Sequence, residues 1–255
     1  MVARGVTKIY SARGGRTVPA LEEISFEAKR GEFIAILGPS GCGKSTFVMS
    51  VAGLVPKSGG SITVDGREVT KPLTDVGIVF QNAVLLDWRT ALENVMLQIE
   101  GRKLDRRQYE PRARQLLAEV GLEGFEQARP GELSGGMRQR VSICRALVHD
   151  PPLLLMDEPF GALDALTRDQ MALDLQRVWD ESRKTVLFVT HSVSEAVFLA
   201  DKVVVFTPRP GRIDRIIDID LPRPRHLSVR DTLEFRDYTR EILDLFIARG
   251  VLRES

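Results

Sequence analysis

Residues 38–45, Gly-Pro-Ser-Gly-Cys-Gly-Lys-Ser, constrain the fold of this chain more than any other segment. They fit the pattern G-x-x-x-x-G-K-[ST], in which glycines let the backbone wrap closely around phosphate groups. The apolar run 33–37 before the pattern predicts a short buried strand, and apolar residues at helical spacing predict a helix over 44–54. A strand, a glycine-rich loop and a helix in this order indicate a P-loop. The alternative, a glycine-rich turn with one exposed lysine, explains neither flanking element.

The P-loop pattern also predicts what its own residues do. Lys44 is expected to reach the β- and γ-phosphates of a nucleotide, and the Ser45 hydroxyl to bind Mg²⁺. The amino end of the following helix adds unpaired N–H donors and positive potential. The nucleotide-binding residues expected in this segment are Gly38, Pro39, Ser40, Gly41, Cys42, Gly43, Lys44, Ser45 and Thr46.

A second segment, residues 151–158, ends in two adjacent acids. The apolar run 153–156 predicts a buried strand, and ligands of open α/β sheets bind at the carboxyl ends of strands. Asp157 is expected to hold Mg²⁺ through water, and Glu158 to polarise the attacking water. Alone, the two acids could equally be a solvated pair at a strand end. Beside a P-loop a site is favoured, because adjacent buried acids are costly without a cation nearby.

A third apolar run, residues 185–190, is followed directly by His191, one of three histidines in the chain. A lone histidine is more often a structural residue. Since this run predicts a further strand of the same sheet, His191 falls at the carboxyl edge where the phosphates are expected. The sequence therefore favours a contact between His191 and the γ-phosphate.

Residues 133–137, Leu-Ser-Gly-Gly-Met, predict a second phosphate cradle. Ser134 has the position of an N-cap, Gly135 and Gly136 allow close approach, and the predicted helix 137–147 points its positive end outward. A chain can have two phosphate-binding segments far apart in its sequence if the second one contacts a nucleotide bound to another protein molecule.

In kind and in order, these segments resemble the motifs of the ATP-binding cassette (ABC) family, and the resemblance covers nearly the whole chain. Gln81, after the predicted strand 76–80, matches the Q-loop glutamine of that family, and residues 162–164 match its D-loop. His191 matches its switch histidine. Tyr10 resembles the aromatic residue that stacks on adenine, although an aromatic residue on a β-strand is ordinarily part of a core.

The resemblance implies that ATP and Mg²⁺ are the cofactors and that the reaction is ATP hydrolysis. It also implies that two copies meet head to tail, so that the signature segment of one, matched here by residues 133–140, completes the site of the other. The implied catalytic residues are Glu158, His191, Gln81 and Lys44; the further ATP contacts are Tyr10, Ser134, Gly135, Gly136 and Asp164; and the Mg²⁺ contacts are Ser45, Gln81 and Asp157.

The fold class implied by the resemblance is α/β: a RecA-like P-loop NTPase core, an N-terminal antiparallel β subdomain and an inserted α-helical subdomain. We expect an ATPase domain over residues 1–220, in which the helical subdomain takes up about 82–150, and a short helical tail over 221–255.

A narrower resemblance points to importers of the nitrate, sulfonate and taurine group. Residues 85–95, which contain Trp88, look like the segment that receives the permease, although most members have proline where this chain has Asp87. The proline- and arginine-rich segments 207–213 and 221–225 are also similar to that group. This implies two transmembrane permease subunits and, indirectly, a substrate-binding protein as partners. The cargo would be a small anion such as nitrate, a sulfonate or taurine.

Composition and charge exclude several other classes. The net charge of +1 provides no broad basic surface for nucleic acid. No apolar run approaches the roughly 18 residues needed to span a bilayer, and residues 1–16 lack the apolar region of a signal peptide. We therefore expect a peripheral location on the cytoplasmic face of the inner membrane. The alternatives are a soluble ABC clamp acting on nucleic acid or ribosomes, which usually has two cassettes or a long coiled coil, and an exporter ATPase.

Four smaller expectations concern the cysteines and the helices. Cys42, in an electropositive loop, is expected to be a reactive thiol without a catalytic role, and Cys144 a small core residue. Residues 112–120 predict the clearest helix of the middle region. A C-terminal helix is expected to carry an apolar stripe, for packing rather than for a partner, of Leu233, Ile242, Leu245 and Phe246.

Overall fold

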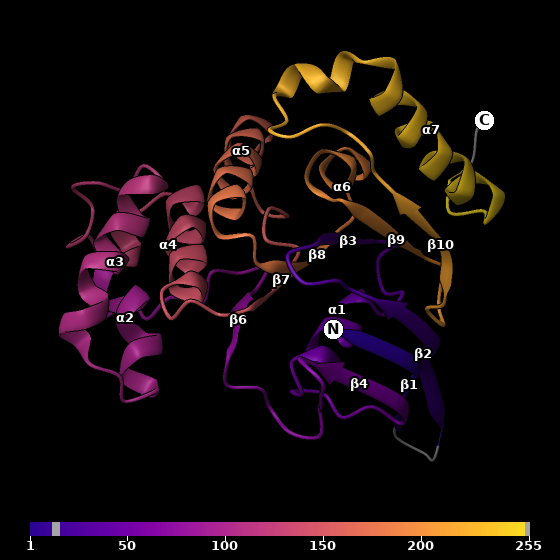
Figure 1. Ribbon diagram of the computed structural model, residues 1–255, viewed down its shortest axis with the longest axis horizontal. Helices are drawn as coiled ribbons and strands as arrows, with labels where there is room; N and C mark the ends of the chain where they lie inside the picture. The colour runs from indigo at the N-terminus through magenta and orange to yellow at the C-terminus, as the bar shows by residue number, and fades with distance from the viewer. Residues whose placement is uncertain (12–15, 253–255) are drawn as a thin grey trace. The chain divides into compact units, whose positions relative to one another are not determined.

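The computed structural model describes residues 1–11 and 16–252 (Figure 1). The chain forms two compact units. The first contains residues 1–74 and 185–255, and the second contains residues 75–184. Both units mix strands and helices, in agreement with the predicted α/β class.

The first unit begins with an antiparallel sheet in the order β2-β1-β4-β5. Val6 on β1 and Ile24 on β2 pair with one another and are fully buried. Alternate residues of these strands point to opposite faces, so one face is available for the core. This sheet confirms the predicted N-terminal antiparallel β subdomain. Its strands are β1 (Val2–Ser11), β2 (Thr17–Glu27), β4 (Gly59–Val64) and β5 (Arg67–Glu68).

The same unit contains the strand that leads into the P-loop. β3 (Phe33–Leu37) lies between β8 (Thr185–Thr190) and β9 (Lys202–Phe206) and is parallel to both. β10 (Ile213–Asp218) adds to β9 in the antiparallel direction. Every residue of β3 and β8 is buried, which is why β3 and the four central residues of β8 are continuous apolar runs in the sequence. The bounds predicted for these two strands are confirmed.

Helix α1 (Lys44–Val51) follows the P-loop and ends three residues earlier than predicted. The reason is Gly53, whose φ of +74° is left-handed and whose Cβ position would lie 2.2 Å from the carbonyl oxygen of Lys71. Only glycine fits this turn. Leu54, which the prediction placed on the buried face of the helix, is exposed.

The first unit ends with α6 (Val193–Leu199) and α7 (Leu233–Ala248). The predicted stripe on α7 is wrong in one position, because Leu233 is 72% exposed. The buried residues of this helix are Phe235, Ile242 and Phe246. Leu233 precedes Ile242 by nine residues, which is about two and a half helical turns and therefore the opposite side.

In the second unit, β6 (Val76–Val79) runs parallel to β7 (Leu153–Asp157), and α4 packs against β6. Helix α2 packs against α3 and α4, as the magenta part of Figure 1 shows. The helices of this unit are α2 (Ala91–Gly101), α3 (Arg106–Glu119), α4 (Gly135–Leu147) and α5 (Ala165–Ser182).

Helix α3 begins six residues before the predicted helix 112–120. Its start is set by Asp105, whose side chain accepts a hydrogen bond of 3.0 Å from the backbone N–H of Arg107. Aspartate is a preferred N-cap, so this start was readable from the sequence. Within residues 1–11 and 16–252, no helix has the length and apolar character that crossing a membrane requires.

Candidate functional site

The P-loop adopts a backbone that requires its glycines. Gly41 and Gly43 have φ of +76° and +105°, in the left-handed region. A Cβ on Gly43 would also lie 2.6 Å from the carbonyl oxygen of Ala20. Gly43 is the N-cap of α1 and provides no side-chain acceptor for the first N–H groups of that helix. These donors and the positive end of the helix fit the phosphates of a nucleotide.

Lys44 lies over the same loop and is only 4% exposed. Its Nζ donates hydrogen bonds to the carbonyl oxygens of Gly38, at 2.8 Å, and Pro39, at 3.1 Å. A buried ammonium held by neutral carbonyls is a strong donor to an anion, because charge-assisted hydrogen bonds are about twice as strong as neutral ones. The position of Lys44 therefore fits its predicted role.

The reactive thiol expected at Cys42 is not supported by the structure, because this residue is 1% exposed. Its Sγ lies 3.0 Å from the position that a Cβ would take on Gly38, so the thiol fills space that the glycine leaves free. Cys42 is thus a packing residue whose backbone belongs to the loop. Cys144 is buried as predicted, and burial raises the pKa of its thiol.

Tyr10, on β1, lies beside the start of α1, and its stacking on adenine stays a prediction. Its Oη is 3.3 Å from Oγ1 of Thr46, and its side chain is 40% exposed rather than part of a core. The Nζ of Lys8 lies 4.8 Å from the centre of the ring.

The sheet register brings His191 to the P-loop edge. Leu37 at the end of β3 pairs with Thr190 at the end of β8. Gly38 and His191, the residues that follow these two, are therefore neighbours at the carboxyl edge of the sheet. The turn at His191 is fixed by Thr190, whose hydroxyl donates to buried Glu195 at 2.6 Å and accepts from the N–H of Ser192 at 3.0 Å. The side chain of Ser192 caps α6. His191 itself is exposed.

The two acids of the second unit lie at the carboxyl end of β7, as predicted. Asp157 is its last residue, and Glu158 has a left-handed φ of +47°. A Cβ on Gly161 would lie 3.2 Å from Nε2 of Gln81 and 3.7 Å from Oε2 of Glu158. The structure therefore brings Gln81 and Glu158 together around Gly161. Sequence reasoning missed Gly161, because nothing in the chain indicates that its missing side chain makes room for these two.

The signature segment has the predicted local structure. Ser134 caps α4 and accepts a hydrogen bond of 3.2 Å from the N–H of Met137. A Cβ on Gly136 would lie 2.7 Å from Cγ2 of Thr167, so this glycine permits the close approach of α4 to α5. Thr167 in turn donates its hydroxyl to Asp164, which is the N-cap of α5. This hydrogen bond holds the pKa of Asp164 below its ordinary value.

Two buried residues of α4 hold the segment around Gln81. Nε2 of Gln139 donates to the carbonyl oxygen of Phe80 at 3.1 Å. The guanidinium of Arg145 donates to the carbonyl oxygens of Ala83, at 2.7 Å, and Val84, at 2.8 Å. Sequence reasoning missed both residues, because a polar side chain on a helix is usually solvated and no pattern marks these two as buried.

Among the described residues, no group of three or more His, Cys, Asp and Glu side chains is arranged to hold a metal ion. Mg²⁺ is commonly bound through one or two protein oxygens together with waters and substrate phosphates. The hydroxyl of Ser45 and the carboxylate of Asp157 are oxygen donors of this type. The chain thus fits a Mg²⁺ ion that arrives with the nucleotide.

A family model described as "ABC transporter" matches residues 21–161. The chain belongs to the ABC transporter family. It is 51% identical, over 84% of its length and 82% of the relative's, to a taurine import ATP-binding protein of Rhizobium johnstonii. It is 39% identical to an aliphatic sulfonates import ATP-binding protein of Bacillus cereus, over 98% of this chain and 97% of the relative.

Among solved structures, the chain is similar to a dimeric ATP-binding cassette in a post-hydrolysis state bound to ADP and Pi. The TM-score is 0.76 with 32% sequence identity, over 87% of this chain and 99% of that chain. The predicted P-loop NTPase fold is confirmed, and the chain is an ABC-type ATPase. Relatives named for import do not favour the clamp or the exporter.

Proposed function

We propose that this chain is the ATP-hydrolysing subunit of a membrane importer for a small anion of the sulfonate type. The observation that carries the ATPase chemistry is the P-loop, with its left-handed glycines, its buried Lys44 and His191 at the same sheet edge. Import and the class of cargo are supported by the names of the relatives, which align over most of the chain.

In the proposed reaction, Lys44 and the N–H groups of the P-loop hold the β- and γ-phosphates, and Tyr10 stacks on adenine. Mg²⁺, when bound through Ser45, Gln81 and Asp157, neutralises phosphate charge. Glu158 accepts a hydrogen bond from the attacking water and orients it. Contacts with the remaining residues complete the site: Gln81, His191 and, from a second copy, Ser134, Gly135, Gly136 and Asp164.

The proposed assembly is a head-to-tail homodimer that binds two permease subunits and, through them, serves a substrate-binding protein. The dimeric state of the similar cassette supports the first part. The chain would then lie on the cytoplasmic face of the membrane, held by the permease. We propose the domain limits 1–220, with a helical subdomain over about 82–150, and a tail over 221–255.

The substitution Glu158→Gln tests the catalytic part. It keeps the shape of the side chain but removes the carboxylate that orients water, so ATP should still bind and hydrolysis should fall by at least about a hundredfold. Size-exclusion chromatography with MgATP should show a dimer that persists, because nucleotide is no longer consumed. Hydrolysis at the wild-type rate would exclude Glu158 from this role.

The importer part is tested by reconstituting the chain with the permease and binding protein in vesicles. ATP hydrolysis and uptake should both rise when taurine or an alkanesulfonate is supplied, and the Glu158→Gln protein should give neither. Hydrolysis that responds to none of taurine, alkanesulfonates and nitrate would contradict the cargo class while leaving the ATPase assignment intact.

A further inference from the structure

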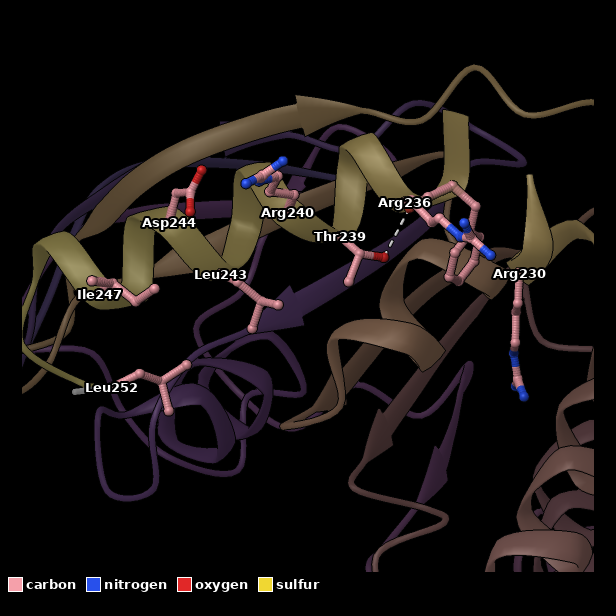
Figure 2. A pocket seen from close by; sticks show the side chains of 9 residues that line it. Arg230, Arg236, Thr239, Arg240, Leu243, Asp244, Ile247 and Leu252 are labelled. Carbon is pink, nitrogen blue, oxygen red and sulfur yellow. Dashed lines mark hydrogen bonds between the residues drawn. The ribbon is translucent and has the colours of Figure 1, made fainter. Parts of the chain in front are cut away.

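A groove runs along one side of the C-terminal helix α7, and no residue that lines it belongs to a nucleotide motif (Figure 2). Its volume is about 620 Å³, within the range of sites that bind small molecules. The lining combines two chemistries, the cations Arg230, Arg236 and Arg240 and the aliphatic side chains Leu243, Ile247 and Leu252.

The aliphatic side chains form one edge of the groove. Figure 2 shows Leu243, Ile247 and Leu252 on one side of α7, toward its carboxyl end. Leu252 returns to the helix after its end, since its N–H donates to the carbonyl oxygen of Phe246, at 3.3 Å. Leu252 is nevertheless exposed. This edge therefore offers apolar surface that a ligand chain could cover.

Two arginines of the groove have guanidinium groups that could bind an anion. Arg236 and Arg240 are exposed, lie four residues apart on α7, and make no side-chain hydrogen bond or ion pair with residues 1–11 or 16–252. Like charges at this spacing repel one another. By contrast, Arg249, the C-cap residue of α7, is paired with Asp214. Arg230 lies over the ring of Phe198, with 5.2 Å between its Cζ and the ring centre.

One acid, Asp244, also lines the groove. Figure 2 shows it beside Arg240 along one edge of the groove, whereas Leu243, Ile247 and Leu252 follow the other edge. No ion pair joins Asp244 to an arginine in the described part of the chain. Even without Arg230, the two exposed arginines outnumber the one carboxylate of the lining, so charge complementarity selects an anion.

We propose that this groove is a binding site for an aliphatic organic anion, a sulfonate or carboxylate with an unbranched hydrocarbon chain. The anionic head binds Arg236 and Arg240, and the chain covers Leu243, Ile247 and Leu252. The guanidinium groups suit this head, because their paired N–H donors match two oxygens of one anion.

Isothermal titration of the nucleotide-free protein with 1-octanesulfonate, kept below the concentration at which it forms micelles, tests the proposal. One saturable site per chain is expected. Affinity should fall about fourfold for each methylene removed from the chain, and 1-octanol and sulfate should each bind far more weakly than octanesulfonate. Absence of saturable binding, or equal binding of octanol, would overturn the proposal.

Variants assign the site to the groove. Arg236→Gln and Arg240→Gln should each weaken octanesulfonate binding about tenfold, and Leu252→Ser should reduce the dependence on chain length. Asp244→Asn should strengthen binding, because it removes the only acid of the lining. Arg107→Gln, at an exposed arginine of α3, is the matched control and should leave affinity unchanged.

Thermal unfolding and ATP binding confirm that each variant is folded, since no substituted residue belongs to a nucleotide motif. Wild-type affinity in the Arg236→Gln, Arg240→Gln double variant would place the anion elsewhere and refute the groove. The titration contains no nucleotide, so its failure would leave the proposed ATPase function untouched.

Discussion

The absence of a side chain at Gly161 leaves the space in which Gln81 and Glu158 lie. The added methyl group of Gly161→Ala would lie 3.2 Å from Nε2 of Gln81, so Gln81 must move by a few tenths of an ångström. Because Gln81 and Glu158 flank this position, kcat for ATP should fall about tenfold. KM for ATP should change little, since the P-loop belongs to the other unit.

The matched control for Gly161→Ala is Gly131→Ala. A Cβ on Gly131 has no heavy atom within 4 Å, so this variant should keep the wild-type kcat. An unchanged kcat in both variants would show that the space at Gly161 is not needed for the positions of Gln81 and Glu158.

His149 makes stability depend on pH. Burial, followed by repulsion from Arg102, lowers its pKa from 6.5 to about 4. Within the described residues, neither ring nitrogen makes a hydrogen bond of normal distance and angle, although the backbone of Val76 lies close enough to oppose the shift weakly. The unfolded chain therefore takes up a proton below about pH 6.5, while the folded protein does so only near pH 4. Stability is lost as the pH falls through this window.

The full difference corresponds to about 3 kcal/mol of unfolding free energy, as an upper limit. Replacement by glutamine, His149→Gln, should flatten the decline between pH 6.5 and pH 4, as measured by urea unfolding at several pH values. His226→Gln, at an exposed histidine, is the control. A decline that is equally steep in the His149→Gln protein would assign it to other groups.

Cys42 marks the limit of what residue type and spacing predict. The motif placed its backbone correctly in the loop. The direction of its side chain depends on Gly38 and Phe206, which approach from β3 and β9 and which no local pattern describes. The places of the motif residues in the fold could thus be predicted from the sequence, but the burial of Cys42 could not.

At the scale of elements, α4 links two motifs that are far apart in the sequence. Its amino end holds the signature residues, and Gln139 and Arg145 further along bind the carbonyl oxygens on both sides of Gln81. Helix α4 and the segment around Gln81 should therefore move together.

Arg145→Met tests this connection. The change leaves the carbonyl oxygens of Ala83 and Val84 without their donor and should lower the unfolding free energy by about 2 kcal/mol. It should also increase the mobility of the nearby loop that carries Trp88, measured as lower fluorescence anisotropy. Arg114→Met removes an exposed ion pair on α3 and should change neither quantity. Equal mobility in the two variants would argue against the connection.

The elements predicted best were the buried parallel strands. β3 and the central residues of β7 and β8 are apolar because they are buried, and such runs have clear limits in a sequence. Helix limits were less predictable. The end of α1 depends on a contact of Gly53 with Lys71, and the exposure of Leu233 depends on which side of α7 the rest of the unit covers.

At the scale of the whole molecule, the predicted site residues belong to two units. Tyr10, the P-loop and His191 lie in the first, whereas Gln81, the signature and the acid pair lie in the second. The sequence could name both groups because each is a local motif. It could not reveal Gln139, Arg145 or Gly161, whose roles arise only when distant segments fold against one another.

The loop that carries Trp88 is where the proposed permease would be recognised. Trp88 is 70% exposed, so the alternative that it packs inside the helical subdomain does not hold in this structure. The loop is nevertheless fixed, because buried Asn94 binds the backbone of Leu86 through donor and acceptor, at 3.1 and 2.8 Å, and that of Arg89 at 3.2 Å. A large aromatic side chain held in solvent by a rigid loop is typical of an interface anchor.

Trp88→Ala should therefore leave the isolated subunit almost unchanged, with an unfolding free energy within about 0.5 kcal/mol of wild type and normal ATP hydrolysis. Binding to the permease should weaken by about 2 kcal/mol, roughly thirtyfold, because interface aromatics are often hot spots. Pull-down by the permease and thermal unfolding are the two measurements. Leu166→Ala, at an 83% exposed leucine of α5, is the control for loss of exposed apolar surface. A large loss of thermal stability with unchanged pull-down would make Trp88 a packing residue and move the docking surface elsewhere.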